Sequence, residues 1–243
     1  MGDLVKRQKT INLYGISEVQ AKDVLEDIIK KKEADIKILT KEGEVQIIVS
    51  ASADTEDEAK AVIKPVSREI KKRFPDSALA VNDKKNLSLE KKLVKLLEKN
   101  DFSISTAESC TGGLLSARII NVPGASEVFK EGMVTYTNKS KRKRLDVSKS
   151  TLKKYGAVSK QTAKEMAAGI AFNSDSDAAL SITGIAGPDG GTEEKPVGLV
   201  YIGLYVKGKI LAEEFHFSGN RQEIREQSVE AALVMLTKYL ESI

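Results

Sequence analysis

The stretch Ala107-Glu108-Ser109-Cys110-Thr111-Gly112-Gly113 decides how this chain is interpreted. Residues 102–106 before it are predicted to form a strand, and residues 114–120 after it a helix. Ser109 and Cys110 then lie at a strand-to-helix turn, where two glycines let the backbone approach a ligand closely. Amides at a helix start lack partners and can hold an anion or a developing oxyanion. A plain glycine-rich turn with a Ser or Thr cap is the alternative interpretation.

The composition indicates a globular protein of one large or two small domains. The chain has 243 residues, of which 41% are hydrophobic and 30% charged, with a net charge of +4 that does not by itself indicate a nucleic-acid partner. Its single cysteine, Cys110, excludes an intrachain disulfide and fits a reducing compartment. Because no apolar run reaches membrane-spanning length and the N-terminus is charged, we expect a cytoplasmic protein without a membrane partner.

The only histidine, His216, lies in the alternating stretch Phe215-His216-Phe217 and is therefore interpreted as an ordinary strand residue. One histidine cannot build a His-rich metal site, and we expect neither a metal nor another cofactor. A Ser-His-Asp triad would have to use His216. If Ser109 or Cys110 is a nucleophile, its base is therefore predicted to be a lysine.

The N-terminal part is predicted to be a small α+β domain with the order β-α-β-β-α. Residues 10–14, 35–40 and 44–50 are interpreted as strands, the last two forming a hairpin through Gly43. Capping-box pairs open both predicted helices, and Pro65 is a candidate kink in the second; the pairs are Ser17 with Gln20 and Thr55 with Glu58.

An RNA-binding KH domain needs a Gly-x-x-Gly loop that clamps the nucleic-acid backbone. The corresponding loop is Gly15-Ile16-Ser17-Glu18, which lacks the second glycine and adds an acidic residue. We therefore expect an interaction or spacer domain rather than a nucleic-acid-binding one. RNA binding would appear as retention on single-stranded RNA with a strong salt dependence.

Turn-forming residues at 75–86 predict a linker, and a second domain begins with a helix whose leucines form one stripe. Later elements are a strand at 134–137, a basic run at 139–144 interpreted as a solvated helix face, and an amphipathic helix after Ser159. A strand at 178–182, an antiparallel pair at 197–206 and 210–217, and a final helix capped by Ser218 or Asn220 complete the chain.

The loop 183–191 follows the strand at 178–182 and contains four glycines and a proline. Its amides can cradle a phosphate or a polar ring, although it matches neither a P-loop nor a dinucleotide-binding fingerprint. A long surface turn is the alternative. Arg221 and Arg225 lie at the start of the final helix, where cations are unfavourable. Their position indicates either a bound anion or a salt bridge to a nearby glutamate.

Five motifs stand out together: Ala-Glu-Ser-Cys-Thr-Gly-Gly at 107–113, Val-Thr-Tyr-Thr-Asn at 134–138 with Lys141, Gly-Ala-Val-Ser at 156–159, the loop 183–191 with Lys195-Pro196-Val197-Gly198, and Phe-Ser-Gly-Asn-Arg at 217–221. In this combination they resemble the C-terminal domain of the competence/damage-inducible CinA family, which includes nicotinamide mononucleotide deamidases. They occur in the family's order over about residues 88–243. The first domain is more weakly similar to the family's KH-like middle domain.

This resemblance implies a KH-like α+β domain at 1–82 and a deamidase domain at 83–243, the latter a three-layer α/β fold with a mixed sheet. Longer family members begin with a molybdopterin-binding-like domain, to which a pyrophosphatase activity is attributed. Nothing in this sequence matches that domain, so neither that activity nor its metal is carried over. The chain is either a natural short form or a piece of a longer protein. The family also implies a homodimer.

The resemblance further implies the roles of single residues. Ser109 matches the nucleophile, Lys141 the base that activates it, and Tyr136 a supporting catalytic residue. Substrate contacts are implied for both glycine-rich segments and for one arginine: Cys110, Thr111, Gly112, Gly113, Thr183, Gly184, Ala186, Gly187 and Arg221. The lysine can act as a base only if burial or nearby positive charge lowers its pKa, and the three cations after Lys141 favour such a decrease.

The predicted reaction is hydrolysis of the carboxamide of nicotinamide mononucleotide through an acyl-enzyme on Ser109. Amides near Thr111 to Gly113 are expected to hold the oxyanion, and the substrate phosphate to rest on the loop 183–191 or near Arg221. Cys110 is the rival nucleophile, since its thiolate would also attack an amide. The alternative to catalysis is a nucleotide-binding or interaction module without turnover.

Overall fold

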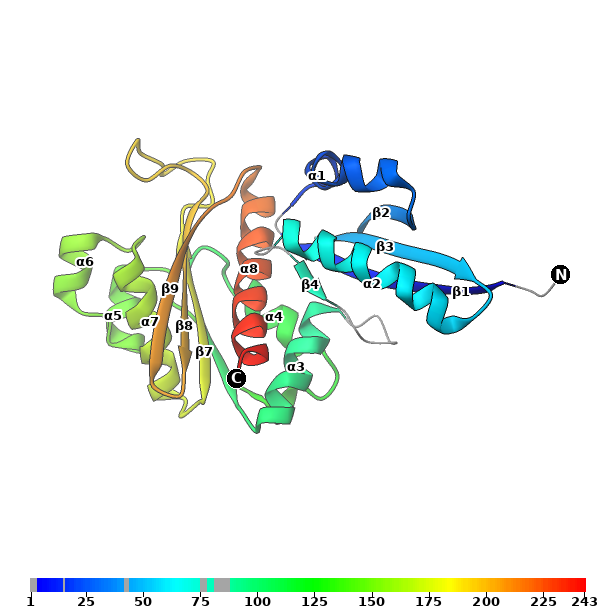
Figure 1. Ribbon diagram of the computed structural model, residues 1–243. Coiled ribbons are helices and arrows are strands. Elements are labelled where there is room, and N and C mark those ends of the chain that lie inside the picture. The colour runs from blue at the N-terminus through cyan, green and yellow to red at the C-terminus, as the bar shows by residue number, and fades with distance from the viewer. Residues whose placement is uncertain (1–3, 15, 42–43, 75–77, 81–87) are drawn as a thin grey trace. The chain divides into compact units, whose positions relative to one another are not determined.

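The computed structural model describes all residues except 1–3, 15, 42–43, 75–77 and 81–87, and the chain divides into two compact units (Figure 1). Unit 1 covers Met1–Leu87 and unit 2 covers Ser88–Ile243. This division lies five residues after the expected one, between 82 and 83. Ala78–Ala80, expected to belong to the linker, instead form strand β4, and the other residues of the predicted linker at 75–86 lie outside the described residues.

Unit 1 is an antiparallel sheet covered by two helices. Its elements are β1 (Val5–Tyr14), α1 (Glu18–Lys31), β2 (Asp35–Lys41), β3 (Glu44–Ala53), α2 (Glu56–Arg73) and β4 (Ala78–Ala80). The strand order is β2-β3-β1-β4, and each neighbouring pair is antiparallel. The predicted β-α-β-β-α order is therefore confirmed, with one further short strand at its end.

Both predicted capping boxes form, at Ser17 with Gln20 and at Thr55 with Glu58. The second helix continues through Pro65 to Arg73. Alternate residues of β1 and β3, such as Ile11 and Ile47, pair across the sheet and are fully buried against the helices. Gly15 and Gly43, at which a break and a hairpin turn are predicted, lie outside the described residues.

Unit 2 contains a five-stranded mixed sheet with the order β6-β5-β7-β8-β9. The strands are β5 (Ile104–Glu108), β6 (Phe129–Val134), β7 (Ala178–Gly184), β8 (Leu199–Val206) and β9 (Lys209–His216). β5 runs parallel to β6 and β7, whereas β7, β8 and β9 are antiparallel. The carboxyl ends of β5 and β7 therefore lie side by side at one edge of the sheet, with Glu108 opposite Ile182.

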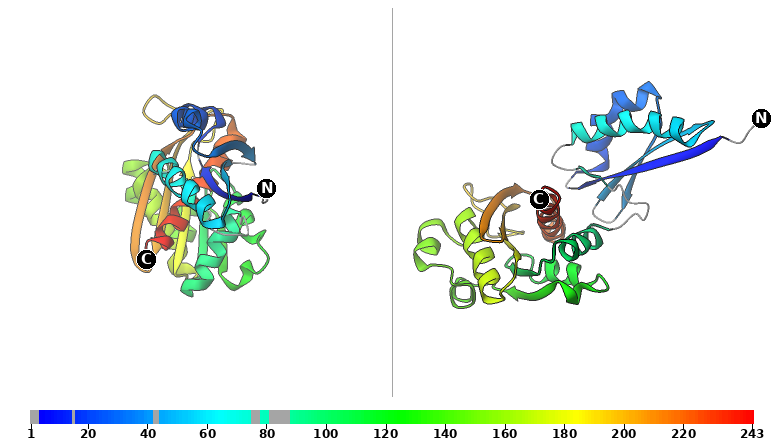
Figure 2. Two further views of the ribbon diagram at one scale, coloured as in Figure 1. Left: turned by 45° about the vertical axis from the view of Figure 1, so that its right-hand side comes forward. Right: turned by 60° about the horizontal axis from the view of Figure 1, so that its bottom comes forward.

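Helices cover both faces of this sheet, which confirms the predicted three-layer fold (Figures 1 and 2). α3 (Leu89–Asn100), α4 (Leu114–Ile120) and α8 (Arg221–Glu241) pack on one face, and α5 (Asn138–Leu145), α6 (Lys149–Tyr155) and α7 (Lys160–Asn173) on the other. A short 3₁₀ turn, η1 (Ala125–Glu127), precedes β6. Among the described helices, none is both long and apolar enough to cross a membrane.

One predicted strand is wrong. Residues 135–137 do not extend a strand, because β6 ends at Val134 and Thr137 instead caps α5 through a hydrogen bond from the Ser140 amide. The strand before the central turn also begins and ends two residues later than predicted, so that Glu108 is its last residue. Of the two candidate caps for the final helix, Asn220 is the one used. Because α5 begins directly after Thr137, Lys141 on this helix lies beside Ser109 at the end of β5.

Candidate functional site

Ser109 directly follows β5, and its amide donates to Ile182 O of the neighbouring β7 at 2.9 Å. The side chain is 8% exposed. The chain then turns through Gly112 and Gly113, whose φ angles of 61° and 97° lie in the left-handed region that favours glycine. Ser109 is therefore held at the rim of the sheet by a backbone bond rather than on a free loop.

The buried carboxylate of Glu108 occupies the start of α4. Its two oxygens accept hydrogen bonds from the Gly113, Leu115 and Ser116 amides at 3.0, 3.1 and 2.9 Å, and from Ser116 Oγ at 2.7 Å. The Gly112 amide donates to Ser109 O at 3.2 Å. The Gly112 and Gly113 amides, expected as oxyanion donors, are thus already used. Among the described residues, the Cys110 and Thr111 amides donate to no backbone carbonyl and to no carboxylate; the Cys110 amide interacts with its own thiol.

Lys141 brings an amine to this turn from the inner face of α5. Its Nζ lies 2.7 Å from Ser109 Oγ and donates to Thr135 O at 2.7 Å. The side chain is 1% exposed, and burial lowers its pKa from 10.5 to about 8. The three following cations, which the sequence offered as a second cause of a low pKa, are exposed and point away from the core. Burial is the cause of the lowered pKa.

Cys110 and His216 are poorly suited to the nucleophile and base roles. Cys110 is 6% exposed, and burial is the main cause that raises the pKa of its thiol to about 11. The thiol therefore stays protonated at neutral pH. His216 is exposed on the edge strand β9, where its Nε2 lies 2.8 Å from Glu214 Oε1. Among the described residues, no group of three His, Cys, Asp or Glu is placed to hold a metal ion.

The end of β7 and the loop after it are largely tied to their own surroundings; β7 runs to Gly184, two residues beyond the predicted strand at 178–182. Thr183 is 1% exposed and its hydroxyl donates to Ala157 O at 2.9 Å. Gly184 has no room for a side chain, since a Cβ there would lie 2.6 Å from Val200 Cγ2. Lys195 Nζ donates to Tyr155 O and Val158 O, both at 2.7 Å. These bonds hold the 156–159 segment against the loop, and the substrate contacts expected of Thr183 and Gly184 stay predictions.

Arg221 connects the loop after β7 with the segment before α5. Its Nη1 donates to Gly187 O at 2.7 Å and its Nη2 to Tyr136 Oη at 3.3 Å. The Tyr136 side chain is 60% exposed, so this contact lies at the surface of the site. The structure thus brings three of the residues expected from separate motifs into one hydrogen-bonded group: Tyr136, Gly187 and Arg221.

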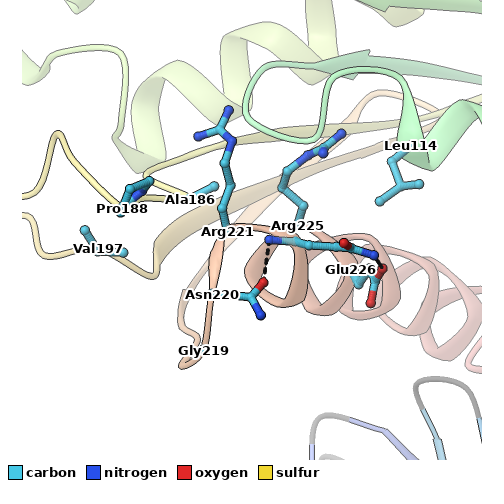
Figure 3. Close-up of a pocket in the computed structure, with 10 residues that line it drawn as sticks. Leu114, Ala186, Pro188, Val197, Gly219, Asn220, Arg221, Arg225 and Glu226 are labelled. Atoms are coloured by element: carbon cyan, nitrogen blue, oxygen red, sulfur yellow. Dashed lines mark hydrogen bonds between the residues drawn. The ribbon is translucent and has the colours of Figure 1, made fainter.

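Arg225, one helical turn further, is bonded to the Ser109 turn itself. Its Nη2 donates to Thr111 O at 2.7 Å, and its buried Nε has no partner among the described residues. A hollow of about 570 Å³ opens beside both arginines. Figure 3 shows the two side chains extending from α8 in the same direction, with Ala186 and Pro188 near one and Leu114 near the other. Ser109 does not itself line this hollow; the Arg225–Thr111 bond connects the two.

Two residues of this arrangement were not predicted from the sequence as site residues. Glu108 stands inside the central motif, but only the three-dimensional course of α4 shows that its carboxylate accepts four hydrogen bonds. Arg225 had a visible signal, since it follows Arg221 by four residues at a helix start where cations are unfavourable. In the described structure neither arginine forms an ion pair with a carboxylate, so a local salt bridge does not explain them.

Comparisons with known proteins agree with this architecture. Residues 86–240 match the family model described as the CinA C-terminal domain, and residues 8–78 match the CinA KH domain. A competence-damage inducible protein of Clostridium novyi is 46% identical over 97% of this chain and 56% of its own length. A CinA-like protein of Kosmotoga olearia is 44% identical over 96% and 56%. The chain spans slightly more than half the length of these curated relatives.

Solved structures cover the second unit. The competence/damage inducible protein of Agrobacterium tumefaciens matches 64% of this chain and 97% of its own, with a TM-score of 0.59 and 41% identity. A CinA superfamily protein of Klebsiella pneumoniae matches 64% and 97%, with a TM-score of 0.62 and 32% identity. With both domain models matched in order, this chain belongs to the CinA family.

Proposed function

We propose that this chain is an amidohydrolase that converts nicotinamide mononucleotide to nicotinic acid mononucleotide and ammonia. The observation that carries the proposal is the 2.7 Å contact between Lys141 Nζ and Ser109 Oγ. An amide carbonyl needs a nucleophile, a base and oxyanion donors, and these groups meet at the end of β5. The family resemblance supplies the substrate.

The lowered pKa of Lys141 supports its role as the base. With a pKa of about 8, roughly a quarter of the amine is neutral at about pH 7.5, compared with about 0.1% for an ordinary lysine. A neutral amine keeps two hydrogens and one lone pair. One hydrogen can serve Thr135 O, while the lone pair faces the Ser109 hydroxyl.

The reaction then proceeds in two halves. Ser109 Oγ attacks the carboxamide carbon while Lys141 Nζ takes the hydroxyl proton, and the carbonyl oxygen becomes an oxyanion near the Cys110 and Thr111 amides. The carbon–nitrogen bond breaks as Lys141 gives its proton to the leaving group, which departs as ammonia. Water then attacks the resulting ester while the same amine takes one of its protons, and the ester C–O bond breaks as Lys141 returns that proton to Ser109 Oγ, which releases the carboxylic acid and restores both residues.

We place the substrate phosphate beside Arg221 and Arg225. Both guanidinium groups border the hollow of about 570 Å³, which falls in the usual size range of ligand sites. The absence of a carboxylate partner for either arginine in the described residues leaves their charge for an anion. The hydroxyl of Thr183, by contrast, is bonded to Ala157 O. The arginines are therefore favoured over the loop 183–191.

The test is ammonia release from nicotinamide mononucleotide without added metal, by the wild type and by Ser109→Ala. We expect the variant to lose activity by at least about 10³-fold, because the acyl-enzyme cannot form. Cys110→Ser is the matched control and should keep most of its activity. Full activity in Ser109→Ala would contradict the serine assignment.

A thermal shift with the same nucleotide separates catalysis from binding alone. The nucleotide should stabilise both the wild type and Ser109→Ala, because the proposed phosphate contacts do not involve the serine. Stabilisation of the wild type without ammonia release would favour the alternative, a nucleotide-binding module without turnover.

A further inference from the structure

The positive charge of this chain is concentrated in one short segment of unit 2. Residues 138–155 carry eight Lys and Arg and one Asp, whereas the other 225 residues carry 31 Lys and Arg and 34 Asp and Glu. Without this segment the net charge would be −3 instead of +4. The overall value, which by itself indicates no nucleic-acid partner, therefore hides a local excess.

Seven of the eight cations are exposed on α5 and α6, four of them around one hollow, and we call the seven the basic patch: Lys139, Arg142, Lys143, Arg144, Lys149, Lys153 and Lys154. All seven are exposed, while the eighth, Lys141, is the buried amine at Ser109. Elsewhere in the described structure lysines and arginines form ion pairs, for example Lys22 with Glu18. In that same described part no member of the basic patch lies within 4.0 Å of a carboxylate.

The fold holds these like charges together. Leu145 and Val147, which interrupt the basic run, are 1% and 2% exposed and pack into the core with Met166 and Ile170. This anchoring fixes α5 and the start of α6 against α7. A hollow of about 420 Å³ opens between them, lined by four members of the patch together with Val147 and Ser148. Unpaired cations held side by side repel one another, so this surface is suited to a partner with closely spaced negative charges.

We propose that the basic patch binds the phosphate backbone of nucleic acid, without reading its sequence. Nucleic acids present phosphates at a regular close spacing, and Lys and Arg that neutralise them release condensed counterions. An anionic membrane is the less suitable partner, because surface-binding helices insert apolar side chains beside their cations. Here Leu145 and Val147 are buried, and the one aromatic ring, Tyr155, is only 37% exposed beneath Lys154 Nζ.

The proposal is independent of the deamidase reaction and does not involve the N-terminal KH-like domain. The KH-like domain is expected to bind RNA poorly because its loop lacks the second glycine, a feature that has no bearing on α5 and α6. The patch also differs from the hollow beside Arg221 and Arg225, with which it shares no lining residue.

The experiment measures the binding of a fluorescent mixed-sequence single strand, and of its duplex, by anisotropy at several salt concentrations. We expect the affinity of the wild type to fall by about 10²–10³-fold between about 50 and 200 mM salt. Arg142→Glu with Lys143→Glu should weaken binding at least tenfold at low salt (about 1.4 kcal/mol per tenfold) and flatten the salt dependence.

The matched control is Lys91→Glu with Lys95→Glu, which removes the same charge from exposed positions of α3 in the same unit. This control should change the affinity by less than about twofold to threefold. Equal weakening by both double variants would show a general charge effect and overturn the proposal. Absence of wild-type binding at low salt would overturn it as well, as would binding to phosphatidylserine vesicles but not to DNA. If the charge reversal unfolds the protein, Arg142→Gln with Lys143→Gln replaces it.

Discussion

The turn after β5 and the end of β7 lie side by side in one sheet, yet the hydroxyl groups of Ser109 and Thr183 there have different environments. Ser109 Oγ lies 2.7 Å from a buried amine, whereas Thr183 Oγ1 donates to the backbone at Ala157 O. Ser109 comes directly after a buried strand and Thr183 is the last residue but one of another, and a glycine-rich segment follows each hydroxyl. The difference shows that the neighbour of a hydroxyl, rather than the loop around it, decides whether it is suited to be a nucleophile.

The largest expected effect comes from removing the amine that distinguishes the two hydroxyls. Lys141→Met keeps the length and the apolar stem of the side chain, but it provides no base. We expect kcat for ammonia release to fall by about 10²–10⁴-fold. Lys139→Met, on the exposed side of the same helix, is the control and should stay within about threefold. If Lys141→Met retained more than a tenth of the activity, the amine would not be what makes Ser109 differ from Thr183 as a nucleophile.

The pH dependence tests the same amine without a mutation. Below a pKa of about 8 the amine is protonated and cannot accept the Ser109 proton, so the rate should fall as pH decreases and level off above about pH 9. At pH values well below 8, the rate should fall about tenfold for each pH unit. Cys110→Ser should keep this profile, since the thiol has a pKa of about 11. A flat profile from about pH 6.5 to 9 would contradict a titrating lysine base.

Glu108→Gln tests whether the turn depends on its internal carboxylate. Four donors face the two oxygens, so an amide that replaces one oxygen by a donor leaves hydrogen bonds unmade. We expect the free energy of unfolding to fall by about 1–3 kcal/mol and kcat to fall roughly tenfold as the Cys110 and Thr111 amides shift. Glu98→Gln, exposed on α3, is the control for both measurements.

The smallest effect on kcat is expected for Thr183→Val, on the other side of the comparison. The substitution removes the bond to Ala157 O, which should lower the free energy of unfolding by about 1 kcal/mol in a denaturant titration. The value of kcat should stay within about threefold. A large rise in KM at unchanged stability would instead assign a substrate contact to this hydroxyl, as the family resemblance implies.

Much of the fold follows from local sequence patterns. Capping boxes, alternating strands and amphipathic helices predicted the element order of unit 1 and most helices and strands of unit 2, while the family resemblance implied the three layers of unit 2. The strand at 134–137 was wrong, because β-branched residues there favour an extended chain while Thr137 is recruited as a cap by the Ser140 amide. Such competition is settled by the register of β6 against β5, which a local pattern does not contain.

The sequence identified most residues of the candidate site, but not the tertiary contacts that set their chemical properties. The motifs indicated Ser109 and Lys141, but the low pKa of Lys141 depends on how deeply α5 packs, which spacing alone does not reveal. The same is true of Glu108, since its four donors come from a helix whose direction only the tertiary structure defines. Arg225 could have been included from its position four residues after Arg221.

The bond from Arg225 to Thr111 O has a consequence for biosynthesis. α8 is translated after every other described element of unit 2, yet it supplies both arginines beside the hollow and one support of the Ser109 turn. A ribosome-bound chain that ends before residue 221 already contains Ser109 and Lys141 but lacks α8 and its two arginines. The hollow beside the arginines is therefore completed only when α8 has emerged and docked, so a nascent chain without α8 lacks the proposed anion site.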